Sequence, residues 1–400
     1  MSNFPAFASQ QTTVASEAAM GQPEPTNAVG VEAATAASAL FSARRLRLAR
    51  ESRTLTQAAV ASEIEVTPAA ISQFEKGDAR PAPQTLLRLA RALEFPVQFF
   101  AAGTAPSSRD PLSEDGPGDR GYFRSLRSIS VTDRRRALAL AQLIRDLADR
   151  LDESVQLPPQ DIPRYPISVD ASPATLEECA AEVRAAWHTP RGPIPDVVST
   201  LERHGAVCAR YHAGTHAVDA FSVPFPERPV VVLGDDKAKR DRERFSAAHE
   251  LGHLVMHEPE CAGTKGIENQ ANRFAAAFLM PADEIRSELP AVPAWNELLI
   301  LKRRWGASIG ALLMRARILR IMPEATYVQA IRYMSARGWR TSEPGDLGAG
   351  EAPQLLALAA TTARESGVTL STLSAETGWP EPIIRDVLAA SSDPRPRLSL

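Results

Sequence analysis

Apolar residues recur with a helical period through most of the chain. Within residues 83–93 and 133–155 they lie three or four positions apart, which places them on one face of a helix. Short runs rich in β-branched residues, at 206–211, 218–223 and 230–233, instead predict strands. The pattern therefore predicts a mainly α protein with a small β-sheet, of the α+β class.

Changes in composition divide the chain into five segments. Residues 1–36 are rich in Ala, Ser, Thr, Gln and Pro, contain no Lys or Arg, and are predicted to be disordered. Residues 37–100 contain short all-α elements, and 101–165 combine a Pro- and Gly-rich linker with a long amphipathic helix. Residues 166–345 contain the strands and more helices, and 346–400 form a helical C-terminal extension.

The second segment carries the capping signals of two short helices joined by a tight turn. Thr56 is a good N-cap for the first helix. Thr67 and Pro68 open the second helix, and Gly77 ends it. A short helix, a turn and a second helix form the helix-turn-helix layout.

The stretches Leu55-Thr-Gln-Ala-Ala59 and Ile71-Ser-Gln-Phe-Glu-Lys-Gly77 resemble the Xre/Cro family of DNA-binding domains, over about residues 40–100. The resemblance implies that the second helix enters the major groove of double-stranded DNA. This region has nine basic and six acidic residues, a modest excess, so a dimer or a second contact is expected. The motif favours DNA over the alternative, a small protein-docking module. Residues expected to face bases are Thr67, Ala69, Ser72 and Gln73, and those expected to meet phosphates are Gln57, Lys76 and Arg80.

The long helix at 133–155 has two interpretations. Its apolar face can pair two copies of the chain, or it can brace the domain that follows. We favour a homodimer because domains of the Xre type usually read paired half-sites.

The stretch from Arg244 to His257 contains the sequence H-E-x-x-H. His249 and His253 lie four positions apart, so on a helix they share a face and can hold one metal ion. Glu250 lies over the same site and can take a proton from a water molecule whose pKa zinc lowers to about 7. These residue types at this spacing predict a metal site with a general base.

A third ligand must come from elsewhere in the chain. The long pattern H-E-x-x-H-x-x-G-x-x-H is excluded, because Met256 and Pro259 occupy its Gly and third His positions. A carboxylate from the next helix is the alternative, and Glu268 is our predicted third ligand, with water in the open fourth position. Glu258 and Glu260 compete with it, but they flank a proline and are expected in a loop.

His257 shares the helical stripe of the two histidine ligands. As a fourth ligand it would close the site and indicate a structural zinc, so we favour a role in the second shell or the pocket. Asn272 lies one turn after Glu268 and is assigned to the same group of residues.

Three stretches resemble the ImmA/IrrE family of zinc metallopeptidases: residues 244–253, Glu268-x-x-Ala-Asn-x-Phe-Ala275, and Leu279-Met-Pro281. The resemblance covers about residues 175–345 and implies a zincin-like domain with one Zn²⁺ per chain. Family practice would make Glu250 the catalytic base. The resemblance also implies a protein substrate, such as a repressor or an antitoxin, that is cut once rather than degraded. The ligands implied are His249, His253 and Glu268.

Composition and charge limit which partners and cellular compartments the sequence allows. The net charge is -3, so nucleic-acid binding must be local. Three widely spaced cysteines, at 179, 208 and 261, suggest a reducing cytosol without a disulfide framework. No apolar run approaches 18 residues and the N-terminus lacks a signal peptide pattern, so we expect a cytoplasmic protein with no membrane partner.

The sequence therefore predicts a DNA-binding transcriptional regulator that carries a zinc-dependent endopeptidase of narrow specificity. The alternative is a DNA-binding repressor whose zinc site is a sensor or a structural element without proteolysis. The complete motif favours the enzyme, because a purely structural site does not need Glu250. A third hypothesis is autocleavage that releases the DNA-binding domain at residues 101–120.

Overall fold

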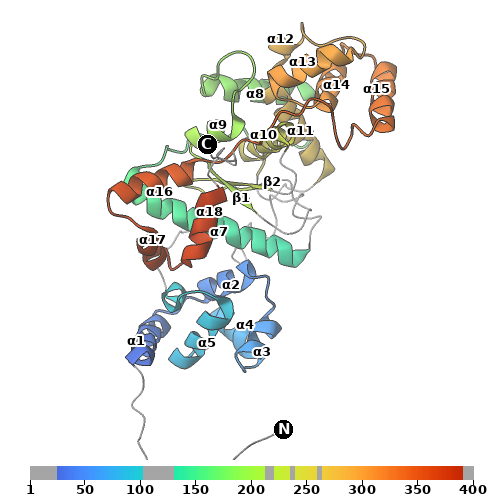
Figure 1. The fold of residues 1–400 in the computed structure, drawn as a ribbon. Coiled ribbons are helices and arrows are strands. Elements are labelled where there is room, and N and C mark those ends of the chain that lie inside the picture. Colours follow the sequence, from blue (N-terminus) through green and yellow to red (C-terminus); the bar gives the residue numbers. More distant parts are fainter. Residues whose placement is uncertain (1–24, 102–129, 212–219, 235–238, 259–263, 391–400) are drawn as a thin grey trace, which may run out of the picture.

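The computed structural model describes residues 25–101, 130–211, 220–234, 239–258 and 264–390. Helices dominate these residues and three strands form one sheet, which confirms the predicted mainly α class with a small β-sheet. Figure 1 shows three tiers: a lower helical lobe, a middle layer built on one long helix, and an upper lobe. No helix in the described ranges is long and apolar enough to cross a membrane.

The lower lobe has the predicted helix-turn-helix layout. The hydroxyl groups of Thr56 and Thr67 accept hydrogen bonds from the backbone N–H groups of Ala59 and Ala70, which confirms both predicted N-caps. Gly77 ends the second helix in the left-handed region, at φ 78°. The elements of this lobe are α1 (Pro25–Ala39), α2 (Ala43–Ser52), α3 (Gln57–Glu63), α4 (Pro68–Lys76), α5 (Pro83–Leu93) and the 3₁₀ helix η1 (Val97–Phe100).

Part of the segment predicted to be disordered is helical. Residues 25–36 lie in α1, which packs against α5 and η1 and buries Ala34 and Ala37. The segment is rich in alanine, a strong helix former, but a short isolated helix is marginal until packing supplies apolar burial. The prediction failed here because that packing partner lies far away in the sequence. Residues 1–24 and most of the predicted linker, 102–129, lie outside the described residues.

The middle tier surrounds α7 (Val131–Val155) with elements of the same chain. Leu143, Leu147 and Leu151 are fully buried. Three C-terminal helices, α16 (Leu355–Glu365), α17 (Leu370–Thr377) and α18 (Glu381–Ala390), complete this tier, and α2, α16 and α17 pack on α7. The apolar face that we expected to pair two chains is therefore covered within one chain. The bracing interpretation of this helix fits the structure.

The sheet is sandwiched between α7 and the upper lobe. Its strands are β1 (Val207–Tyr211), β2 (Ala220–Val223) and β3 (Val230–Gly234), in the order β1-β3-β2, with β1 parallel and β2 antiparallel to β3. Successive side chains of a strand point to opposite faces. Val207, Phe221 and Val232 join the core around α7, whereas Cys208 and Val231 join the core of the upper lobe. Each strand thus contributes to both cores.

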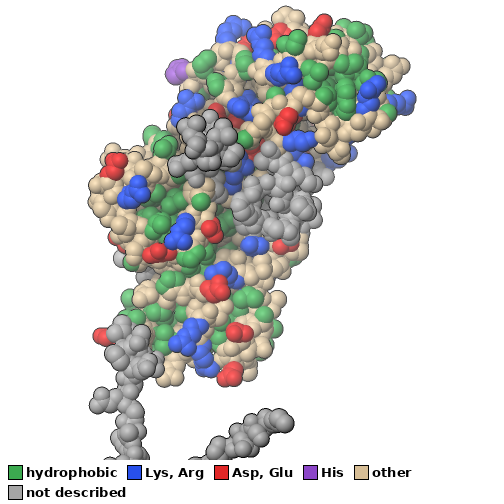
Figure 2. Space-filling view, in the orientation of Figure 1, with side chains coloured by type: hydrophobic (Ala, Val, Ile, Leu, Met, Phe, Trp, Pro, Cys, Tyr) green, Lys and Arg blue, Asp and Glu red, His purple; other side chains and the backbone are tan. Residues whose placement is uncertain are grey.

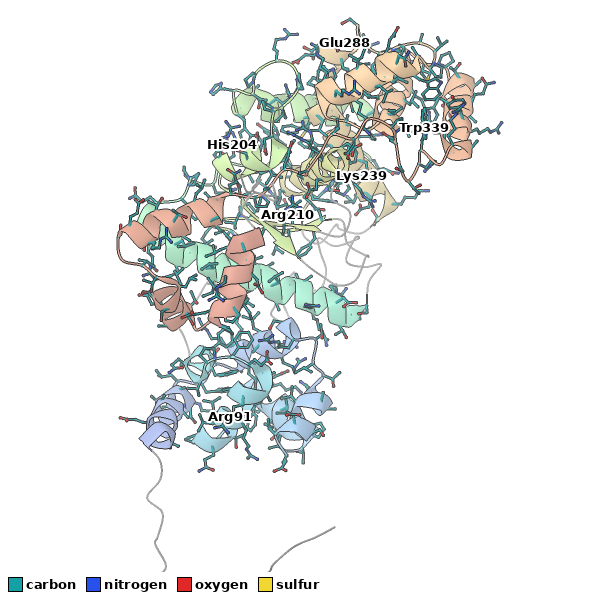
Figure 3. The ribbon with its side chains drawn as sticks, viewed as in Figure 1. Arg91, His204, Arg210, Lys239, Glu288 and Trp339 are labelled. Carbon is teal, nitrogen blue, oxygen red and sulfur yellow. The ribbon has the colours of Figure 1, made fainter. Side chains whose placement is uncertain are left out.

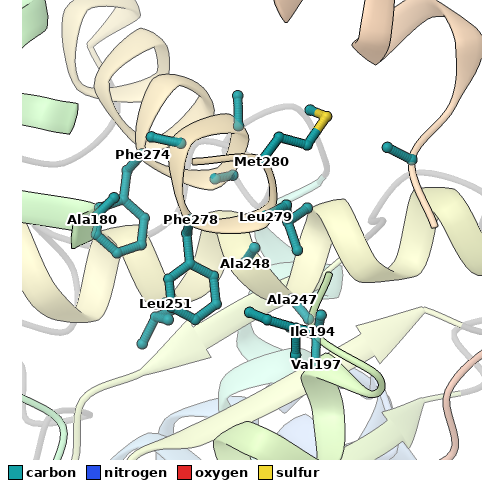
Figure 4. Close-up of a cluster of buried hydrophobic side chains, with 14 of the residues drawn as sticks. Ala180, Ile194, Val197, Ala247, Ala248, Leu251, Phe274, Phe278, Leu279 and Met280 are labelled. Atoms are coloured by element: carbon teal, nitrogen blue, oxygen red, sulfur yellow. The ribbon is translucent and has the colours of Figure 1, made fainter. Parts of the chain in front are cut away.

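The upper lobe contains α8 (Pro173–Ala186), α9 (Val197–Arg203), α10 (Arg240–Met256), α11 (Lys265–Leu279), α12 (Ala282–Ile285), α13 (Trp295–Trp305), α14 (Ile309–Ile318) and α15 (Glu324–Ala336). Its core lies between α10, α11 and α8. Figure 4 shows Phe274 and Phe278 of α11 beside Leu251 and Ala248 of α10. The two phenylalanine rings stack at 5.9 Å between centroids.

An extended segment leads from the upper lobe back to the C-terminal helices. The buried carboxylate of Glu351 accepts hydrogen bonds from the N–H groups of Val197 and Val198 and pairs with the guanidinium of Arg244 on α10. Glu202 of α9 accepts hydrogen bonds from the N–H groups of Gln354 and Leu355, at 3.0 and 3.1 Å, and so caps α16. Two carboxylates, of Glu351 and Glu202, therefore fix the end of this segment that leads into α16.

The C-terminal helices also contact the lower lobe. Arg45 of α2 donates hydrogen bonds to the carbonyl oxygens of Phe99 and Thr377, at 3.3 and 3.1 Å. A Cβ atom on Gly378 would lie 2.7 Å from the Cα atom of Phe99, so the two backbones touch here. The helix-turn-helix lobe is thus held by α7 and by the C-terminal extension.

Glu202 should make stability depend on pH. Burial raises the pKa of this carboxyl from 4.5 to about 7. Between these values the folded chain binds the proton more tightly than the unfolded chain, so the free energy of unfolding falls as the pH rises. Relative to Glu202→Gln, the wild type should lose about 3 kcal/mol between pH 4 and pH 8. Urea unfolding at both pH values measures the difference. Glu365→Gln, at an exposed position on α16, is the control and should show no such change.

Candidate metal centre and nucleic-acid interface

Close packing of α10 against α11 brings the predicted ligands together. His249 and His253 lie one turn apart on α10. Gly252 faces α11, where an added Cβ atom would lie 3.0 Å from the Phe274 ring. Because no side chain separates the helices at this point, Glu268 in the first turn of α11 reaches both histidines.

The three side chains form a group with metal-binding geometry. The Nε2 atoms of His249 and His253 are 3.0 Å apart, and they lie 3.4 and 3.8 Å from the Glu268 carboxylate oxygens. All three donor atoms fall within 4.8 Å of one another. Two imidazole nitrogens and one carboxylate oxygen fit the three-ligand zinc site that keeps a fourth position open. Of the competing carboxylates, Glu258 pairs with Arg164 and Glu260 lies outside the described residues.

A hydrogen bond orients the first histidine. The Nδ1 atom of His249 lies 3.0 Å from the Oδ1 atom of Asn272, one turn after Glu268 on α11. An amide oxygen only accepts, so Nδ1 carries the proton and Nε2 keeps its lone pair for the ligand group. Asn272 also lines the cleft described below.

A longer chain of hydrogen bonds orients the second histidine. Gln270 donates from Nε2 to the carbonyl oxygens of Ser168 and Val169, at 2.9 and 3.0 Å, which leaves its Oε1 atom to accept from Nε2 of His257. With that nitrogen protonated, Nδ1 of His257 accepts from Nδ1 of His253, at 2.9 Å. The lone pair of His253 is thereby directed toward His249 and Glu268.

His257 therefore lies behind the ligand group. It is 1% exposed, lies outside the three-residue group, and does not line the cleft. The interpretation of His257 as a fourth ligand is not supported, because both of its nitrogens already have protein partners. Burial lowers its pKa to about 4, so this imidazole is neutral near pH 7.

Glu250 occupies a buried position beside the ligands. It is 4% exposed, and its Oε2 atom accepts a hydrogen bond from the Ser222 hydroxyl of β2, at 2.7 Å. Burial raises the pKa of Glu250, although the Ser222 hydrogen bond and any protonated form of His249 oppose that rise. Burial also lowers the pKa of His253 far below its ordinary value. A carboxylate of raised basicity thus lies on the same cleft wall as His249, where a general base can act.

The site opens on a cleft of about 1460 Å³. His249, Glu250 and Asn272 form part of its wall, which also includes residues of α8, α14 and the segment after α15. A cleft of this size exceeds the usual range of small-molecule pockets. It has room for a segment of polypeptide.

Sequence reasoning missed two residues of this site, Ser222 and Gln270. Ser222 is fully buried in the apolar strand Ala220–Val223, and a polar residue in such a strand was the available signal. Gln270 lies three residues after Ile267 and four before Phe274, on the apolar face of α11. A glutamine on that face must have hydrogen-bond partners, which only the fold identifies.

The predicted DNA-contacting residues lie in or beside α3 and α4, which Figure 1 shows at the end of the lower lobe remote from the upper lobe. Ser72 is half-buried. Gln57 donates from Nε2 to Glu75 at 2.7 Å, so one amide hydrogen remains for another acceptor. Glu75 also pairs with Arg50, which fixes α4 on α2. The exposed members of the predicted set are Thr67, Ala69, Gln73, Lys76 and Arg80.

Fold and site together define a chain that joins a helix-turn-helix lobe to a helical lobe whose H-E-x-x-H residues and Glu268 have the arrangement of metal ligands. Comparison with known families agrees: residues 46–100 match the helix-turn-helix family model, and residues 201–317 match the peptidase family described as the IrrE N-terminal-like domain. Both predicted resemblances are thereby confirmed, and the chain carries a metallopeptidase-like domain after its helix-turn-helix. No match was found among the curated proteins.

Replacing Gln270 should weaken metal binding without touching a ligand. Gln270→Leu removes the acceptor that fixes the His257 ring, and His253 loses its orientation in turn. We expect zinc affinity to fall about 10–100-fold in competition with a chelating indicator. Gln142→Leu replaces a buried glutamine of α7, remote from the site, and should leave zinc affinity unchanged. Equal affinities in both variants would contradict the proposed relay.

Proposed function

We propose that this protein is a DNA-binding transcriptional regulator whose zinc-dependent endopeptidase makes a regulatory cut in a repressor-like or antitoxin-like protein. The observation that carries the proposal is the convergence of His249, His253 and Glu268 beside Glu250, on the wall of a cleft. A site that only stabilised the fold would need neither a general base nor a cleft.

In this proposal, His249, His253 and Glu268 hold one zinc ion per chain. Bound zinc would supply Lewis-acid polarisation of a peptide carbonyl and a lowered pKa for water. Glu250 takes the proton of the attacking water and returns it to the leaving amine. Ser222 restrains one carboxylate oxygen of Glu250, and this leaves the other oxygen for proton transfer.

The sheet offers a means of holding an extended substrate. Among the described strands, β2 pairs only with β3, so its other edge is unpaired there. This strand also packs on α10 and contributes Ser222 to the site. An extended peptide that added to this edge would lie beside Glu250. We therefore assign β2 to substrate backbone binding.

The DNA-binding arm of the proposal rests on the exposed face of α4. Helix α4 lies in the lobe remote from the peptidase lobe (Figure 1), so DNA and a protein substrate can be bound together. We infer one of two arrangements. Bound DNA positions the peptidase domain near its substrate, or the DNA site at which the regulator acts also controls the peptidase.

The peptidase is tested by comparing new protein N-termini in cells that express the wild type or Glu250→Gln, after both are shown to bind zinc. This near-isosteric change removes the base but keeps the ligands, so we expect termini found only with the wild type. Purified candidate substrates then confirm direct cleavage. The same termini in both cultures, with zinc bound, would leave a regulator whose metal site senses or stabilises.

DNA recognition is tested by selecting bound sequences from random duplexes. Gln73→Ala should lose about 1–3 kcal/mol of discrimination at one base pair, because an amide reads a base edge by two hydrogen bonds. Lys76→Ala should weaken binding to all sequences and reduce the salt slope by about 1. Arg364→Ala, exposed on α16 outside this lobe, is the control. No selected sequence, or equal losses in all three variants, would refute DNA recognition by α4.

A further inference from the structure

The cleft beside the metal centre has an unequal balance of charge. Of the acidic side chains on its wall, Glu177 is paired with Arg315, and Glu324 is paired with Arg317. Two more, Asp241 and Glu343, share the ammonium group of Lys302, at 2.9 Å each. Three cations therefore offset about half of the negative charge of the six carboxyl groups on the wall, which also include Glu178 and Glu250.

Several cations on the same wall have no such compensation. Arg273, Arg320 and Arg340 line the cleft and have no carboxylate partner among the described residues. Lys239 and Arg286 also line it, and within the described part of the chain each donates to a backbone carbonyl oxygen and has no carboxylate partner. Figure 3 labels Lys239 near the end of α10, and Figure 2 shows Lys and Arg side chains over the upper lobe.

These cations belong to separate elements that surround one space. Arg273 directly follows Asn272, the partner of His249, whereas Arg320 follows α14 and Arg340 follows α15. Charges brought to one concave site from distant parts of the sequence reinforce one another, because the cleft focuses their field. A single solvated helix face would not produce this arrangement.

We propose that the cleft selects an acidic segment of polypeptide, with carboxylate side chains next to the bond that is cut. The inference rests on the proposed peptidase function and names its substrate class. Carboxylates of an extended peptide would meet Arg273 on one wall and Arg320 and Arg340 on another. Nucleic acid is the alternative ligand for these cations, and competition with duplex DNA distinguishes it from an acidic peptide.

Binding is measured with the zinc-loaded Glu250→Gln chain, so that cutting does not interfere. The probes are fluorescein-labelled decapeptides in which Ala alternates with Glu, Gln or Lys, and Kd is read by anisotropy. At low salt the Glu peptide should bind about tenfold more tightly than the Gln peptide, and this preference should shrink as salt is raised. The Lys peptide should bind most weakly.

Charge-reversal variants show whether the preference for the Glu peptide over the Gln peptide arises in the cleft. Arg273→Glu and Arg340→Glu together should reduce the preference for the Glu peptide to near unity. Arg303→Glu makes the same change at an exposed position of α13 outside the cleft and should preserve the preference. Thermal unfolding of each variant verifies that the fold is retained.

The outcomes separate the two proposals. Equal binding of the Glu and Gln peptides, or the same loss in Arg303→Glu as in the cleft variants, would overturn the acidic specificity even if cellular cleavage is found. Displacement of the bound Glu peptide by duplex DNA would also overturn it, by assigning these cations to nucleic acid. If no new N-termini are found in cells, only the proposed catalysis is contradicted, because peptide binding is measured without turnover.

Discussion

The contact between α10 and α11 is the constraint on which the rest of the site depends. Two histidines on one helix present only two ligands, so a third must be brought in by a second helix. Gly252 permits that approach, and the Phe274 ring occupies the space that a side chain would fill. The buried apolar residues around this contact (Figure 4) stabilise it, so the position of Glu268 is set by core packing.

Burial also explains the hydrogen-bond network behind the ligands. Polar groups lose their water when α10 and α11 pack, and each must find a protein partner. His257 and Gln270 satisfy one another and the backbone at residues 168 and 169. The same bonds define which nitrogen of His253 carries the proton. The need to satisfy buried polar groups thus both stabilises the packing of α10 on α11 and orients His253.

The sheet links the tiers of the structure, because side chains from its two faces enter two hydrophobic cores. Its two faces supply both hydrophobic cores, and α7 connects one face to the lobe that carries α4. The Glu351–Arg244 pair joins the segment before the C-terminal helices to α10, which carries two of the predicted metal ligands. The helix-turn-helix lobe and the lobe that carries the H-E-x-x-H group are therefore joined by packed contacts.

The sequence by itself determined the local features. Thr56, Thr67 and Gly77 mark helix ends because capping depends on neighbouring residues, and the His249–His253 spacing defines a shared face for the same reason. The candidate Glu268 followed from its place in an adjoining helix. Only the tertiary structure decided what lies far apart in sequence: the α1 contact that makes residues 25–36 helical, the covering of α7, the partners of Ser222 and Gln270, and the pairing of charges in the cleft. These features depend on which surfaces exclude water together, and that is a property of the packed chain.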